Sequence, residues 1–85
     1  MAVSLLHLPN GRVSLEYEPA NGPSVRKAIN TRYGRMRRRW FVAAGETTFG
    51  GERFAAQGEW GHPCLVSTSE LGSDMLCTIA SDLEK

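Results

Sequence analysis

The first part of the chain has an alternation of apolar and polar residues that predicts a β-hairpin. Residues 2–8 and 12–18 flank the tripeptide Pro9-Asn10-Gly11, whose residue types favour a tight turn. From Val13 to Tyr17 every second residue is apolar, the pattern of a half-buried strand. The first segment has apolar residues on both of its faces. We therefore expect it to lie centrally in a sheet or to be covered on both sides.

The next pattern predicts a helix that ends at Tyr33. Pro23 suits the first helical turn, and apolar residues then recur at helical spacing as far as Tyr33. Gly34 fits the left-handed residue that often ends a helix. Arg32 falls beside the apolar face of this helix. We expect its side chain to extend to solvent or to reach a glutamate of the preceding strand.

The middle of the chain predicts short strands separated by glycine turns. Residues 36–44 and 47–49 are interpreted as strands, with Gly45-Glu46 as the turn between them. Gly50-Gly51 predicts a second turn or a bulge. Residues 52–61 fit either a short strand or one helical turn.

A short apolar strand over residues 64–67 precedes the clearest helical pattern. Ser67 and Glu70 have the spacing of a capping box. Gly72 weakens the helix that follows. Its apolar stripe consists of Leu71, Met75, Ile79 and Leu83, flanked by Leu76 and Ala80. Burial of this amphipathic helix against the strands predicts one α+β domain over residues 1–85. We expect a two-layer sandwich of a small, mostly antiparallel sheet and two helices.

Composition narrows the class of protein. The 85 residues are 41% hydrophobic and 22% charged, values typical of a globular domain and not of a disordered or membrane-spanning chain. No secretory signal is recognisable at the N-terminus, so we expect a cytoplasmic protein with no membrane partner, and thiols at Cys64 and Cys77. Because so short a chain needs its aromatic residues in its core, we interpret Phe49, Phe54 and Trp60 as core residues.

The near-zero net charge hides a strong asymmetry. Residues 1–42 carry eight Lys or Arg and two Glu, a net charge of +6, whereas residues 43–85 carry two basic and seven acidic residues, a net charge of −5. Seven basic residues and no acidic one lie between Arg26 and Arg39. Such a distribution steers a charged partner toward one part of the surface.

The basic run carries the candidate binding site. Guanidinium groups bind phosphate through paired hydrogen bonds, and aromatic rings offer a stacking surface to bases. In a strand, Arg37 and Arg39 share one face with Phe41, and two residues of the preceding helix could extend the patch. The predicted contact residues are Arg26, Lys27, Arg35, Arg37, Arg38 and Arg39, with Tyr33 or Phe41 as the stacking ring.

The sequence offers little support for a catalytic or a metal-binding site. His62 and Cys64 lie close together, but no pair of histidines or cysteines has the spacing of a zinc site. A nucleophile and base could be drawn from Cys64 or Ser67 with a histidine, yet nothing supplies a third, orienting group. We therefore expect no cofactor, no metal and no enzymatic activity.

Two binding functions remain open. The first is a nucleic-acid-binding module that uses the basic run. The second is an inhibitor or adaptor that docks on an acidic protein surface, or that mimics nucleic acid with its acidic half. Its profile is similar to that of the small proteins with which phages and mobile elements block host defence nucleoprotein complexes. A homodimer is compatible with either function.

Overall fold

The strands of this chain form one antiparallel sheet, and helices pack against it. The computed structural model describes residues 3–40, 45–57 and 63–84. Within them the elements are β1 (Val3–His7), β2 (Val13–Tyr17), the 3-10 turn η1 (Pro19–Asn21), α1 (Gly22–Tyr33), β3 (Arg37–Trp40), β4 (Gly45–Phe49), β5 (Glu52–Gln57), β6 (Cys64–Ser67) and α2 (Glu70–Leu83). The six strands lie in the order β1-β2-β6-β5-β4-β3, and all neighbours are antiparallel. The predicted α+β class is confirmed.

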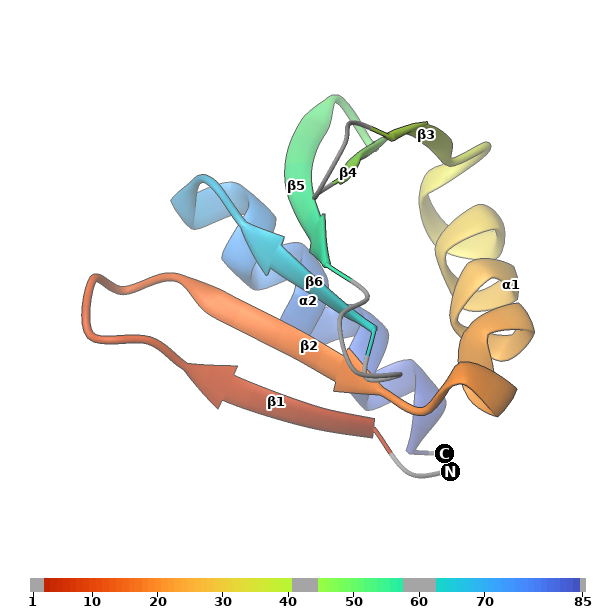
Figure 1. The fold of residues 1–85 in the computed structure, drawn as a ribbon, viewed down its shortest axis with the longest axis horizontal. Coiled ribbons are helices and arrows are strands. Elements are labelled where there is room, and N and C mark those ends of the chain that lie inside the picture. Colours follow the sequence, from red (N-terminus) through yellow and green to blue (C-terminus); the bar gives the residue numbers. More distant parts are fainter. Residues whose placement is uncertain (1–2, 41–44, 58–62, 85) are drawn as a thin grey trace.

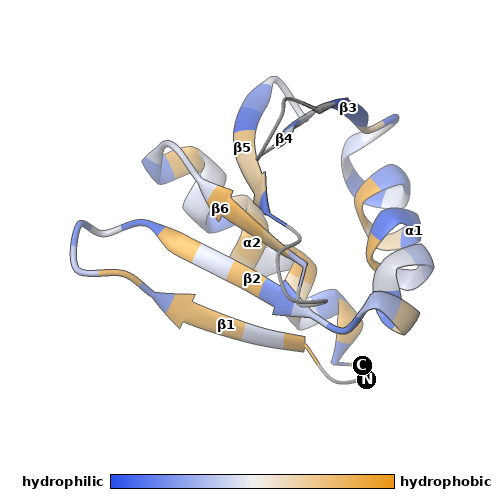
Figure 2. Cartoon of the chain, viewed as in Figure 1, coloured by the Kyte–Doolittle hydropathy of each residue, from blue (hydrophilic) through white to orange (hydrophobic). Residues whose placement is uncertain are grey.

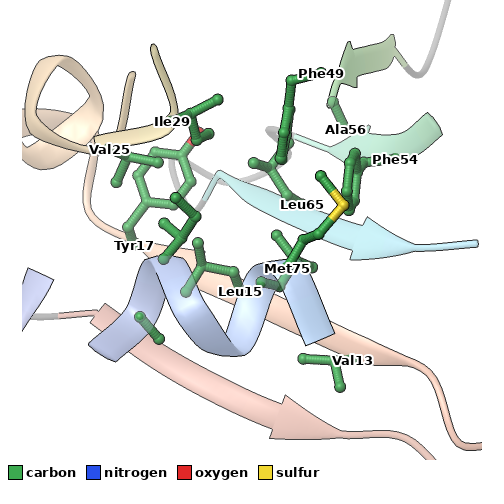
Figure 3. Close-up of a cluster of buried hydrophobic side chains, with 13 residues drawn as sticks. Val13, Leu15, Tyr17, Val25, Ile29, Phe49, Phe54, Ala56, Leu65 and Met75 are labelled. Carbon is green, nitrogen blue, oxygen red and sulfur yellow. The ribbon is translucent and has the colours of Figure 1, made fainter. Parts of the chain in front are cut away.

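The two helices cover one face of the sheet. In Figure 1, α2 passes behind β2 and β6, and α1 stands at the end of the sheet that carries β3. The buried side chains of the strands meet those of the helices in one cluster (Figure 3). This core consists of Val13, Leu15, Tyr17, Val25, Ile29, Phe49, Phe54, Ala56, Leu65, Met75, Leu76, Ile79 and Ala80. Figure 2 shows apolar residues along β1, β2 and β6 and polar ones along β3 and the outer side of α1.

The N-terminal hairpin forms as predicted, but its first strand lies elsewhere in the sheet than expected. β1 and β2 pair antiparallel from Val3 opposite Tyr17 to His7 opposite Val13. The sheet begins at β1, so this strand is an edge strand, and the prediction of a central or doubly covered strand is wrong. Leu6, on the face away from the helices, keeps 47% of its surface exposed.

The boundaries of the central strands also differ from those that the sequence pattern predicts. Gly45 and Glu46 pair with Trp40 and Arg39, so they belong to β4 and the predicted turn there is wrong. The turn at Gly50-Gly51 is confirmed, because both glycines adopt positive φ angles, 58° and 81°. The ambiguous segment becomes a strand over its described part, since β5 runs from Glu52 to Gln57. The expected strand residues 41–44 lie outside the described residues.

The C-terminal helix begins at a different serine from the one predicted. Ser69 is the N-cap of α2, and its Oγ accepts a hydrogen bond from the Gly72 N–H at 2.9 Å. Ser67 instead lies buried in β6, where its Oγ accepts from the Val13 N–H at 2.9 Å. Within the apolar stripe, Met75 and Ile79 are buried and Leu83 is partly buried, whereas Leu71 at its start keeps 59% of its surface exposed.

Two aromatic rings of the core, one from β4 and one from β5, stack on each other. Phe49 and Phe54 stack with a centroid distance of 4.2 Å and an interplanar angle of 8°. Both are almost fully buried, so their assignment to the core is confirmed. Trp60 lies outside the described residues.

Candidate functional site

The arginines of β3 point alternately to the two faces of the sheet. Arg38 pairs with Thr47, which is fully buried on the helix side, so Arg38 lies on that side as well. Its neighbours Arg37 and Arg39 pair with Thr48 and Glu46 on the open face. The prediction that Arg37 and Arg39 share a face is therefore confirmed. The run of arginines forms two surfaces and not one.

Arg38 and residues of α1 line one groove. The groove has a volume of about 610 Å³, and the residues that line it are Gly22, Pro23, Arg26, Lys27, Asn30, Thr31 and Arg38. Three of these side chains are cationic, and none of the described lining residues is acidic. The first turn of α1 also lies in the groove, where the positive end of the helix dipole favours an anion.

The phase of α1 determines which of its residues reach the groove. Val25 and Ile29 are buried in the core, at 2% and 0% exposure. The residues that follow each of them, Arg26 and Asn30, therefore face outward with Lys27 and Thr31. These positions are spaced at i and i+4, so they lie one above the other on the helix surface.

A short connection brings β3 back toward the same helix. Gly34 ends α1 with φ of 85°, and its N–H donates to the Asn30 carbonyl oxygen at 3.1 Å. The Asn30 side chain then accepts a hydrogen bond from the Met36 N–H at 3.1 Å. This bond attaches the residue just before β3 to the groove side of α1. Arg26 and Arg38 therefore line the same groove although they lie twelve positions apart in the chain.

Tyr17 couples the groove to the core. Its side chain is 7% exposed, and burial raises the pKa of its hydroxyl above the usual value of 10.0. The charges of Arg38 and Arg26 act in the opposite direction, and the Arg38 side chain also hydrogen-bonds to the hydroxyl. The phenol is therefore neutral at neutral pH. It holds Arg38 without cancelling its positive charge.

A second groove, between α1 and α2, differs from the first in its charge balance. It has a volume of about 660 Å³ and also contains Lys27 and Thr31. Here Arg32 donates to both carboxylate oxygens of Asp82, at 2.6 and 2.8 Å. The expectation that Arg32 reaches a glutamate of the hairpin is wrong, because Asp82 of α2 takes that role.

The remaining predicted contact residues lie outside the groove. Arg35 is exposed in the connection between α1 and β3, and Arg37 and Arg39 are exposed on the open face. Tyr33 is half-buried, with its ring centroid 5.7 Å from that of Phe49, so it packs at the margin of the core. Phe41 lies outside the described residues.

Sequence reasoning did not select Asn30, Thr31 or Tyr17 as site residues. Asn30 and Thr31 line the groove beside the predicted cations, and Tyr17 interacts with Arg38. The spacing of Arg26 to Asn30 and of Lys27 to Thr31 could have identified the first two. Tyr17 had no local signal, because its contact with Arg38 joins distant strands.

Other candidate chemistry has little structural basis in the described part of the chain. No group of three His, Cys, Asp or Glu residues that could hold a metal ion occurs there. Cys64 and Cys77 are both free thiols of intermediate burial. The Ser67 hydroxyl is committed to Val13 and to Ser73, whose Oγ lies 2.7 Å away.

None of the helices described in this structure is both long and apolar enough to cross a membrane.

Comparisons with protein-family models, with curated proteins and with solved structures gave no match.

Proposed function

We propose that this chain is a nucleic-acid-binding module that holds a phosphate backbone in the groove between α1 and β3. The observation that carries the proposal is the convergence of Arg26, Lys27 and Arg38 on one groove whose described lining contains no carboxylate. Phosphate oxygens accept hydrogen bonds from guanidinium and ammonium groups. The amide of Asn30 and the hydroxyl of Thr31 supply neutral donors beside them.

The contrast between the two grooves supports this choice of site. In the groove between the helices, Asp82 pairs with Arg32 and occupies its donors. In the groove between α1 and β3, the Tyr17 hydroxyl that contacts Arg38 is neutral, so it adds no negative charge to the groove. An anion gains more from the groove between α1 and β3, because three of its lining residues are cationic and none of its described lining residues is acidic.

A cytoplasmic location fits this function. Both cysteines are free in the structure, which is the state that a reducing compartment maintains. A phosphate-binding module would also meet its ligand there.

The experiment is a fluorescence anisotropy titration with labelled duplex and single-stranded DNA and RNA at several salt concentrations. Three phosphate contacts predict a slope of about −3 for log K against log salt on duplex DNA. Exchange of Arg26 and Lys27 for glutamate removes two contacts. It should weaken binding by about tenfold or more and reduce the magnitude of the slope by about 2.

The matched control is the double variant Arg12→Glu/Arg53→Glu. It changes the net charge by the same amount, but at the hairpin turn and on β5, outside the groove. If both double variants weaken binding equally, the net charge and not the groove determines binding, and the site assignment is wrong. Arg37→Glu/Arg39→Glu tests the open face in the same way, and a larger effect there would move the site to that face.

Absence of binding at low salt to every nucleic acid would overturn the proposal. The same cations would then be tested against acidic protein surfaces, by affinity capture that survives nuclease treatment.

A further inference from the structure

The two edges of the sheet differ in how they are protected. Among the described strands β1 pairs only with β2, and β3 pairs only with β4. Exposed edges invite another strand to pair, and natural edge strands discourage this with charges or proline. β3 carries three arginines, whereas β1 carries no Lys, Arg, Asp, Glu or Pro. The edge at β1 is therefore the one open to a partner.

The pattern of hydrogen bonds shows which groups of β1 face outward. The Leu8 N–H donates to the Arg12 carbonyl oxygen at 2.8 Å, directly after the strand. On β2, the N–H groups of Val13 and Tyr17 point to the other side, toward Ser67 and Pro63. Bonded and non-bonded pairs alternate along an antiparallel ladder. The backbone groups of Ser4 and Leu6 therefore face β2, and those of Val3, Leu5 and His7 face away from the sheet.

These outward groups are symmetric about Leu5. We propose that β1 pairs antiparallel with β1 of a second copy of this chain, about a two-fold axis at Leu5. Leu5 then pairs with its own equivalent, and Val3 pairs with His7 in both directions. Each copy supplies three N–H donors and three carbonyl acceptors, so the register satisfies every outward group of the strand.

Side chains and charge favour the same pairing. Val3 and Leu5 are half-buried and pack against the core on the helix side, so the pairing extends that core across the axis. Leu6, which is 47% exposed, comes to lie beside Ser4 of the other copy. No like charges oppose each other. In contrast, self-pairing centred on β3 would set arginine against arginine, which destabilises a ladder.

The proposed dimer has a consequence beyond the single binding groove. A two-fold axis perpendicular to the sheet keeps both helix layers on the same side of one continuous sheet. Because β3 is the edge opposite β1, the two basic grooves lie at the far ends of that sheet. The dimer therefore presents two equivalent cationic sites to one side.

Sedimentation velocity with a reductant present tests the pairing over a concentration series. We expect the wild type to approach twice the chain mass of 9.4 kDa and to dissociate on dilution. His7→Pro removes one outward N–H that the β1–β2 ladder does not use, and proline is tolerated at such positions. Leu6→Lys adds a charge to the edge and leaves the backbone unchanged. Both variants should sediment as monomers.

Leu71→Lys is the matched control, because Leu71 is an exposed leucine of α2, away from the edge. It should sediment like the wild type. A wild type that remains monomeric at every soluble concentration overturns the proposal, and so does a dimer that neither edge variant dissociates. If His7→Pro does not fold, Leu6→Lys decides alone. Nucleic-acid binding by the monomeric variants would show that failure of the dimer leaves the groove function intact.

Discussion

Replacement of Gly72 by alanine measures how closely α2 approaches the sheet. A methyl group at this position would lie 3.1 Å from the Ser69 Oγ and 3.2 Å from the Phe54 Cε2. The distance to the Phe54 Cε2 is shorter than the optimal separation of about 3.5–4.0 Å between carbon atoms, and the distance to the Ser69 Oγ is also shorter than an ordinary van der Waals contact. The glycine is therefore a packing requirement of the helix–sheet contact, although it lies inside a helix.

Two opposing effects determine the sign of the change in stability. Alanine favours a helix over glycine by about 1 kcal/mol. Neither neighbour can move without cost, because Ser69 caps the helix through the Gly72 N–H and Phe54 is fully buried against Phe49. Loss of the cap costs about 1 kcal/mol, and overpacking a core costs roughly 1–3 kcal/mol. We expect Gly72→Ala to destabilise the fold by about 1 kcal/mol, which lowers Tm by roughly 4–8 °C in a domain of this size.

Urea and thermal unfolding of Gly72→Ala provide the measurement. The pair Asp74→Ala and Asp74→Gly, at an exposed position of the same helix, calibrates the helix propensity alone. In a Phe54→Leu background the smaller side chain leaves room for the methyl group. There Gly72→Ala should cost less stability than in the wild type. A Gly72→Ala protein more stable than the wild type would refute the reasoning, because the steric conflict would then be weaker than the gain in propensity.

Two further predictions concern buried polar groups. Ser67→Ala should lower the free energy of unfolding, measured in urea, by about 1–3 kcal/mol, because it leaves the buried Val13 N–H without its acceptor. The control Ser73→Ala leaves that bond in place and should cost less. Equal losses would show that the bond to Val13 is not the cause. Folding raises the pKa of Tyr17 above 10.0. The stability that this group contributes is therefore present below pH 10.0 and is lost as the pH rises through the higher pKa of the folded state. Tm measured across this pH range should fall for the wild type and fall less for Tyr17→Phe, and parallel curves would show that Tyr17 is not the group responsible.

Local signals predicted the elements whose ends depend on their own residues. The hairpin follows from Asn10, whose side chain accepts from the Arg12 N–H at 3.0 Å, and from Gly11 at φ of 81°. The first helix ends at Gly34 for the same kind of reason, a positive φ angle that glycine adopts without strain. Amphipathic spacing identified α2, since a helix of this composition is stable only when its apolar side is buried.

The errors arose where a contact between distant residues decides the structure. Whether β1 is central or at an edge depends on which strand lies beyond it, and the pairing of β2 with β6 leaves β1 outside. The spacing to Glu70 selected Ser67 as the cap. The hydrogen bond from Val13 commits Ser67 to the sheet, so Ser69 caps the helix. Arg32 met its partner on a helix fifty positions later, which no local pattern could indicate.

The basic run shows why a charge pattern predicts a binding face only in part. Consecutive residues of a strand point to opposite sides, so Arg37, Arg38 and Arg39 cannot serve one ligand from one face. The structure combines Arg38 with cations of α1 instead, and this needs the helix phase set by buried Ile29 and the reversal tied by Asn30 to the Met36 N–H. β3 is an edge of the described sheet and pairs with β4 alone among the described strands. The charge run thus predicted the type of residue that lines the groove. Topology selected the cations that converge on one groove, and it left Arg37 and Arg39 on the open face of the sheet.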